Sequence, residues 1–202
     1  MSDAFPPSPV PIDRRAPPPP GPVERVVLLG YMTSGKSTVG AAVARRLEWG
    51  FLDFDVEIER RAGATVPDLV AEDGTERLRE MEAALTGEVA GGRHLVMAPG
   101  GGWITRPELL AMLGPGTLAV WLRVSPEETA RRLMADSIER PFRELEDPVP
   151  PIARMIAERE PLYRLADLSI PTDGRSAESI AYEIECVVRV RALAAFAPQA
   201  HA

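Results

Sequence analysis

Residues 23–38 read VERVVLLGYMTSGKST, an apolar run that ends in a segment rich in glycine and hydroxylated side chains. The run before Gly30 is typical of a strand that is buried on both faces of a parallel sheet. From Lys36 to Leu47 apolar residues recur at helical spacing, so the intervening segment is predicted to be a loop between a strand and a helix. Lys36 is the only lysine in the chain, whose other cationic side chains are arginines.

The loop from Gly30 to Ser37 matches the pattern GxxxxGK[ST] in full, in the strand–loop–helix context that this phosphate-binding motif requires. Backbone N–H groups of such a loop approach phosphate oxygens, and the helix N-terminus adds positive potential. A lysine brings a compact charge on a flexible stem to the β- and γ-phosphates, whereas a planar guanidinium would not fit the same cradle. The motif therefore predicts a nucleotide site, with Lys36 on the phosphates and Ser37 on Mg²⁺.

Strands alternate with helices along the rest of the chain, which predicts one α/β domain over residues 23–195 with a parallel sheet. Further strands are expected at 51–54, 94–99, 117–124 and 167–172, and helices at 56–63, 65–74, 75–90, 106–113, 125–135, 152–160 and 176–196. Residues 136–150 carry mixed charge and no periodicity, so they are expected to form a mobile loop. Residues 196–202 are expected to be a disordered tail.

Composition restricts the class of protein and its partners. Residues 1–22 contain nine of the 21 prolines and are expected to be a disordered, partly polyproline II arm. No apolar run approaches the roughly 18 residues of a membrane span, and the single Cys186 fits a reducing cytoplasm. A formal charge of −7 argues against a nucleic-acid surface. An anionic substrate would then need a local cluster of arginines.

Four further features carry polar side chains or glycines suited to such a substrate: Asp53 with Asp55, Arg79, Gly100–Gly102, and Arg140 with Arg159. Three consecutive glycines suggest backbone pressed against a ligand, because a turn alone needs only one. Each polar feature also has a purely structural interpretation. Asp55 could cap the following helix, Arg79 could pair with Glu76 or Glu82, and the other two arginines could be solvated surface charge.

In order and spacing these motifs resemble the shikimate kinase family over about residues 24–190. The matching elements are GxxxxGKST, LDFD, DGxxxxRxxE at 73–82, GGG, RRL followed by an RP loop, and ERxPLY. The resemblance implies a P-loop kinase fold, a three-layer α/β/α arrangement with a five-stranded parallel sheet and a mobile lid at about 136–150. It also implies transfer of the ATP γ-phosphoryl group to the 3-hydroxyl of shikimate, in chorismate biosynthesis.

The same resemblance assigns roles to individual residues. Asp53 would hold Mg²⁺ through water together with Ser37, and Asp55 would bind and deprotonate the hydroxyl. Arg79 and Arg159 would bind the shikimate carboxylate, and the substrate would also be lined by Gly100, Gly101 and Gly102. Lys36 and the lid residue Arg140 would act on the transferred phosphate. Nucleotide binding would involve Gly30, Thr33, Ser34, Gly35, Lys36, Ser37, Thr38, Arg132, Arg140 and Arg175.

The chain departs from the family pattern at a few positions. Thr33 replaces a usual P-loop glycine, Val70 and Leu78 replace frequent aromatic residues, and Pro99 precedes the triple glycine. Two alternatives stay open: a related small-molecule kinase of gluconate type, and a non-catalytic ligand-sensing domain. The paired aspartates and arginines favour a hydroxylated carboxylate as substrate. A cytoplasmic monomer that binds ATP and shikimate, without nucleic-acid or membrane partners, is expected.

Overall fold

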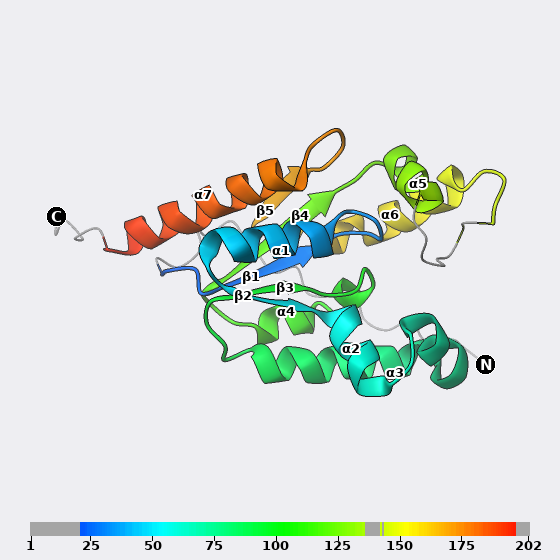
Figure 1. The fold of residues 1–202 in the computed structure, drawn as a ribbon, viewed down its shortest axis with the longest axis horizontal. Coiled ribbons are helices and arrows are strands. Elements are labelled where there is room, and N and C mark those ends of the chain that lie inside the picture. The colour runs from blue at the N-terminus through cyan, green and yellow to red at the C-terminus, as the bar shows by residue number, and fades with distance from the viewer. Residues whose placement is uncertain (1–20, 136–141, 143, 197–202) are drawn as a thin grey trace, which may run out of the picture.

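Five parallel strands form the centre of the computed structural model, which describes residues 21–135, 142 and 144–196 (Figure 1). The strands lie in the order β2-β3-β1-β4-β5. Their bounds are β1 Arg25–Leu29, β2 Gly50–Asp53, β3 Leu95–Ala98, β4 Thr117–Arg123 and β5 Leu168–Pro171. Because every pair is parallel, all five carboxyl ends lie at one edge of the sheet.

Helices cover both faces of this sheet, which confirms the predicted α/β class (Figure 1). On one face lie α1 (Lys36–Leu47) and α7 (Ala177–Phe196). On the other lie α2 (Phe54–Ala62), α3 (Val66–Val89), the 3₁₀ helix η1 (Trp103–Thr105) and α4 (Glu108–Met112). Two further helices, α5 (Pro126–Ala135) and α6 (Val149–Tyr163), pack on one another near the carboxyl ends of the strands.

Strand β1 is buried on both faces, as its continuous apolar sequence predicts. Val26 and Leu28 belong to the core beneath α1 and α7, while Val27 and Leu29 belong to the core beneath α2, α3 and α4. This alternation follows from the two-residue period of a strand. The strand that leads into the P-loop is therefore held by two separate cores, which fixes the position of the loop.

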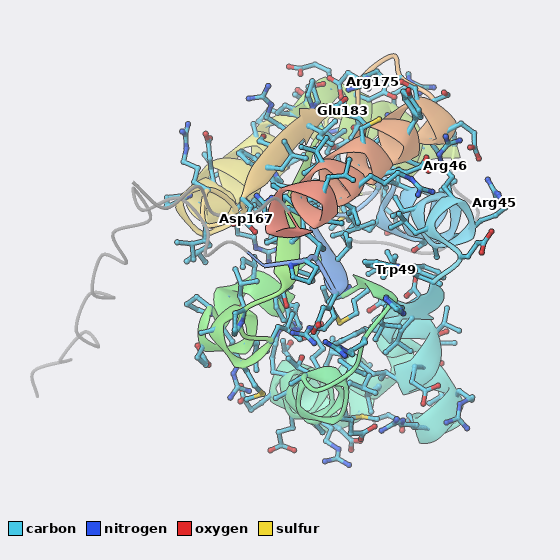
Figure 2. All side chains as sticks on the ribbon, turned by 90° about the vertical axis from the view of Figure 1, so that its left-hand side faces the viewer. Arg45, Arg46, Trp49, Asp167, Arg175 and Glu183 are labelled. Atoms are coloured by element: carbon cyan, nitrogen blue, oxygen red, sulfur yellow. The ribbon has the colours of Figure 1, made fainter. Side chains whose placement is uncertain are left out.

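Ion pairs connect α1 with α7 at the solvent side of the first core. Arg45 pairs with Glu178, and Arg46 Nε donates to Glu185 Oε2 at 2.7 Å. Figure 2 shows Arg45 and Arg46 projecting from α1 on the flank of the two helices. The Arg45–Glu178 pair is exposed, and such pairs contribute roughly 0–1 kcal/mol, whereas the Arg46–Glu185 pair is partly buried.

The predicted break inside α3 is confirmed, and the predicted starts of two helices, α2 and α6, are wrong. Gly74 has φ 84° and ψ 164° inside α3, so the predicted break between two helices at this glycine is confirmed. By contrast, α6 begins at Val149, so the last two residues of the predicted loop 136–150 are helical. Prolines are tolerated in a first helical turn, whose N–H groups have no intrahelical partner, and this is why the proline-rich start of α6 is helical.

Other predicted segments lie outside the described residues: the arm at 1–20, the lid residues 136–141 and 143 including Arg140, and the tail at 197–202. Within the described ranges, no helix combines the length and the apolar character that a membrane crossing requires.

Candidate active site

A cleft of about 620 Å³ opens at the carboxyl ends of the strands, beside the P-loop. The P-loop from Met32 to Thr38 forms one wall. The other walls come from Asp53, Asp55, Ala98, Pro99, Gly101, Arg131, Arg132, Ala135, Thr172, Arg175, Ala177 and Ile180. Ligand sites of open α/β sheets lie in this position, outside the carboxyl ends of the strands.

The P-loop has the backbone conformation that its glycines permit. Gly30 has φ 152°, and a Cβ there would lie 2.7 Å from the carbonyl oxygen of Leu122. Thr33 stands where the family usually has glycine and adopts the left-handed conformation at φ 56°. That conformation costs a non-glycine residue roughly 1–2 kcal/mol. Thr33 therefore keeps the left-handed conformation of the loop although a threonine side chain disfavours it.

The N-terminus of α1 faces the cleft with its first residues. Gly35 is the N-cap and has no side chain to occupy the free N–H groups, and no acidic residue lies in the first turn. Lys36 Nζ donates to the carbonyl oxygens of Gly30 and Tyr31 at 3.0 and 3.1 Å, so its stem folds over the loop. The loop, the helix terminus and the lysine together form a site for a polyphosphate.

Ser37 and Asp53 meet at the floor of this site, as predicted for a metal pair. Ser37 Oγ donates to Asp53 Oδ2 at 2.5 Å. A hydroxyl and one carboxylate suit Mg²⁺, which takes oxygen ligands and retains water and substrate phosphate in its shell. Groups of three or more histidine, cysteine, aspartate or glutamate residues placed for a metal ion do not occur within the described residues.

The helix cap at this position is Asp53, so the alternative interpretation of Asp55 as a cap is wrong. Asp53 Oδ1 accepts from the backbone N–H groups of Asp55 and Val56 at 3.1 and 3.5 Å. Consequently α2 begins at Phe54, two residues before the predicted start. The cap role of Asp53 leaves Asp55 in the first turn, where its carboxylate lines the cleft.

Asp55 lies against the triple glycine that follows β3. A Cβ on Gly100 would lie 3.0 Å from Asp55 Oδ1 and 2.7 Å from Glu82 Oε1. Two carboxyl groups therefore approach the same glycine from α2 and α3, and only a glycine leaves room for both. This close approach is the structural reason for the first of the three glycines.

Arg79 lies against the third glycine and pairs with a buried acid. Its guanidinium forms an ion pair with Glu82, one of the two acids considered from the sequence, and occupies the space that a side chain on Gly102 would need. Glu82 is fully buried, and its Oε1 lacks a hydrogen-bond partner among the described residues. Burial raises the pKa of Glu82, and the hydrogen bond from Arg79 opposes that rise.

Arg159 reaches the middle glycine from α6. Its Nη1 donates to the carbonyl oxygen of Gly101 at 3.3 Å, and the Tyr163 hydroxyl donates to the same oxygen at 3.0 Å. Burial raises the pKa of Tyr163 to about 12, so this hydroxyl keeps its proton. Arg159 thus reaches the cleft through Gly101, which lines it, whereas Arg79 lies against Gly102. Among the described residues with predicted substrate roles, Asp55 and Gly101 line the cleft, and Arg79, Gly100, Gly102 and Arg159 lie behind them.

Two arginines on the nucleotide side also lie at predicted positions. Arg132 Nη1 donates to the Thr33 carbonyl oxygen at 3.0 Å, and its Nη2 donates to that of Thr172 at 3.2 Å. Arg175 donates to Glu183 at 2.8 Å, and Figure 2 shows these two side chains close together beside α7. Both arginines line the cleft, and both contact Thr172, whose carbonyl oxygen accepts from Arg132 Nη2 and from the Arg175 backbone N–H.

Of the residues with predicted roles, all but Arg140 are described. Three residues of the site received no role from the sequence: Tyr31, Glu82 and Tyr163. Each stands inside a quoted motif at a position that the motif leaves variable or unexplained. The i, i+3 spacing from Arg79 was the one available signal for Glu82, whereas the tyrosine contacts join elements far apart in sequence.

Comparison with known sequences identifies the family. A family model described as shikimate kinase matches residues 32–189. The shikimate kinase of Moorella thermoacetica is 41% identical over 160 residues, which cover 79% of this chain and 91% of that protein. A shikimate kinase of Thermus thermophilus is 40% identical over 167 residues, covering 82% of this chain and 90% of that protein.

Comparison with solved structures agrees. A shikimate kinase from Acinetobacter baumannii, solved in complex with shikimate, matches with TM-score 0.77 and 32% identity over 85% of this chain and 96% of that one. A gluconokinase from Sinorhizobium meliloti 1021 matches with TM-score 0.58 and 19% identity over 89% and 98%, which shows likeness of fold alone. The chain therefore belongs to the shikimate kinase family, whose members transfer the γ-phosphoryl group of ATP to the 3-hydroxyl of shikimate.

Proposed function

We propose that the cleft carries out this transfer with Mg²⁺-bound ATP, and that its two sides bind different reactants. The observation that carries the proposal is the position of Gly101. A Cβ on Gly101 would lie 3.4 Å from the backbone nitrogen of Met32 in the P-loop, and its carbonyl oxygen accepts from Arg159. The phosphate-binding loop and an arginine suited to a carboxylate therefore meet across one residue. Such proximity is what a direct transfer between two bound substrates requires.

The P-loop side would hold the triphosphate. The N–H groups at the start of α1 face the cleft without a cap, and Lys36 can turn from its carbonyl contacts toward phosphate oxygens. Arg132 and Arg175 would contact the nucleoside side of ATP, because both line the cleft beyond Thr33. In this arrangement the donor phosphate points toward Asp55 and the triple glycine.

Ser37 and Asp53 would hold the metal. When bound, Mg²⁺ supplies charge neutralisation for the phosphate oxygens. The chain's own contribution is to fix the two oxygen ligands: Ser37 is anchored in the first turn of α1, and Asp53 is anchored as the cap of α2. This arrangement sets the ligands before any nucleotide arrives, which lowers the ordering cost of binding.

Arg79 and Arg159 would bind the carboxylate of shikimate as charge-assisted hydrogen-bond donors. The buried Glu82 keeps the Arg79 guanidinium against Gly102 through their ion pair. Arg159 differs, since no carboxylate of the described residues lies within ion-pair distance of it. Arg132 and Arg175 line the cleft and pair with Glu128 and Glu183. Of these four arginines, Arg159 therefore offers a positive charge that no described carboxylate pairs with, and this charge would attract an anionic substrate in a chain whose net charge is −7.

Asp55 would accept the proton of the attacking hydroxyl. Its carboxylate lines the cleft between the Ser37–Asp53 pair and the triple glycine, next to the position proposed for shikimate. Since Asp53 caps the helix, Asp55 has no cap role to compete with proton transfer. A positioned base of this kind contributes typically 10²- to 10⁴-fold to rate.

We further propose that the chain acts as a cytoplasmic monomer, without nucleic-acid or membrane partners. Residues of one chain, from the P-loop to Ile180 in α7, are sufficient to enclose a cleft of about 620 Å³. The single Cys186 suits a reducing compartment. Sedimentation equilibrium at assay concentrations tests the monomer, and a dimer mass would refute it.

A coupled assay of ADP release tests the reaction. We expect ADP only when ATP, Mg²⁺ and shikimate are all present, with no signal when gluconate replaces shikimate. Gluconate-dependent release would favour the alternative kinase. Tight shikimate binding without any turnover would favour the ligand-sensing alternative. The absence of both binding and turnover would refute the proposal.

A further inference from the structure

Tyr31, the second residue of the P-loop, lies with its ring against Arg159. The guanidinium carbon of Arg159 is 5.6 Å from the ring centroid of Tyr31, within the range of a cation–π interaction. Tyr31 is 2% exposed and Arg159 is half-buried, so the ring side of the contact is shielded from water. Cation–π attraction grows when the pair is desolvated, which makes this contact stronger than its surface equivalents.

The orientation of the Tyr31 ring is fixed by its neighbours. It packs in a small core with Ala130 and Leu133 of α5 and Ile152 of α6, and its hydroxyl donates to Met155 Sδ at 3.3 Å. Thioether sulfur is a weak acceptor, so the hydrogen bond from the Tyr31 hydroxyl is weak. The ring, and not the hydroxyl, therefore carries the interaction with Arg159.

Arg159 thus has contacts with Tyr31 and Gly101, besides the interaction with Tyr163 of its own helix. The ring of Tyr31 lies on one side, and the carbonyl oxygen of Gly101 accepts from Nη1 at 3.3 Å. Neither partner carries a formal charge, so the arginine is oriented without being neutralised. Arg79 is held differently, by the carboxylate of Glu82.

We propose that Tyr31 is a positioning residue that orients Arg159 toward the carboxylate of the acceptor substrate. The same residue contacts the nucleotide side, since its backbone carbonyl accepts from Lys36 Nζ at 3.1 Å. One residue of the P-loop therefore contacts both the phosphate-binding lysine and an arginine of the acceptor site. The inference rests on the role proposed above for Arg159.

The test compares Tyr31→Leu, which removes the aromatic face, with Tyr31→Phe, which retains it. We expect Tyr31→Leu to raise the shikimate KM roughly threefold to thirtyfold, the range of a partly to fully desolvated cation–π contact. The ATP KM should change much less, and Tyr31→Phe should retain the shikimate KM of the parent chain. An equal rise in both variants, or no rise in Tyr31→Leu, would overturn the assignment.

A second readout separates positioning from a general packing defect. In an Arg159→Ala background, replacing Tyr31 with leucine should have no further effect on the shikimate KM, because the oriented group is gone. The methyl ester of shikimate lacks the carboxylate charge. The ratio of the KM of Tyr31→Leu to the KM of the parent should therefore be much smaller for the ester than for shikimate. Additive effects of the two substitutions would show that Tyr31 acts on packing alone.

The proposed function fails separately from this inference. If the parent chain neither binds nor turns over shikimate, the proposed function is refuted and the role of Tyr31 falls with it. If the parent chain is active and Arg159→Ala raises the shikimate KM while Tyr31→Leu does not, only the Tyr31 inference is refuted.

Discussion

The two sides of the cleft are built in contrasting ways. The phosphate side comes from one stretch, Gly30–Thr38, and consists largely of backbone N–H groups, a helix terminus and one lysine. The proposed acceptor side comes from α2, α3, α6 and the triple glycine, and consists of charged side chains, of which Arg79 pairs with the buried Glu82 and Arg159 donates to a backbone carbonyl oxygen. A backbone site depends on loop conformation, whereas a side-chain site depends on the packing of distant elements. The first is therefore local in sequence and the second is not.

The largest effect should come from Lys36→Arg. This substitution tests whether the shape of one cationic side chain matters for turnover on the phosphate side, which otherwise consists largely of backbone groups. We expect turnover to be abolished, a fall of about 10³-fold or more, because a planar guanidinium cannot replace the compact ammonium at the phosphates. Steady-state kinetics with saturating shikimate measure this. Thermal unfolding should stay near that of the parent, and activity within a few fold of the parent would contradict the assignment.

Asp55→Asn should lower kcat by about 10²-fold while leaving ATP affinity and stability nearly unchanged. The matched control is Asp53→Ala, which removes the cap of α2 and should lower the free energy of unfolding by about 1 kcal/mol. Urea denaturation separates the two aspartates, because only Asp53→Ala should lose stability. The kcat should fall in both variants, since Asp53 is also a proposed Mg²⁺ ligand. If Asp55→Asn is the variant that unfolds while its soluble fraction stays active, Asp55 is structural.

Arg79→Ala and Arg159→Ala sharpen the comparison within the acceptor side. Each should raise the shikimate KM about tenfold to a hundredfold, the effect of one charge-assisted hydrogen bond. Only Arg79→Ala should also destabilise the fold, by about 3 kcal/mol, because it leaves the buried Glu82 without its cation. The double variant Arg79→Ala with Glu82→Gln should regain most of that stability and keep the high KM. A raised ATP KM instead would mean that the two sides are wrongly assigned.

The smallest effect concerns pH. Burial raises the pKa of Glu82 above its unfolded value of 4.5, so on raising the pH the unfolded chain loses this proton first. Relative to Glu82→Gln, the parent should therefore lose stability as pH rises from 4.5 to the raised pKa, and the difference should then level off. Urea midpoints of the two proteins between pH 4 and pH 7, compared at each pH, measure this. A difference that grows in the opposite direction would show that the pairing with Arg79 outweighs burial.

The contrast between the two sides also explains how much could be predicted from the sequence. The alternation of apolar runs and helical periods was sufficient to predict the parallel sheet, and the P-loop motif was sufficient to place Lys36 and Ser37 in the first turn of α1, at the cleft. The helix start at Phe54 was missed because two aspartates stand within three residues, and either can cap a helix. The start of α6 was missed because prolines end most helical patterns but are accepted in a first turn.

The acceptor side could be located only through the resemblance. Asp55, Arg79 and Arg159 are far apart in sequence, and each has an ordinary structural interpretation when taken alone. What joins them is the close packing at Gly100, Gly101 and Gly102, which depends on how α2, α3 and α6 meet the end of β3. The tyrosine contact with Arg159 was beyond prediction for the same reason, since it joins residues 31 and 159 across two elements.

The double use of the Asp53 carboxylate restricts how this protein can evolve. One oxygen begins a helix and the other receives the serine of the proposed metal pair. At position 53, asparagine would still cap the helix but would lack the negative charge. Glutamate would keep the charge, but its longer side chain is a poor helix cap. Neither single step is neutral. With the metal role proposed for Asp53, a substitution of this residue alone therefore alters either the start of α2 or the proposed metal site.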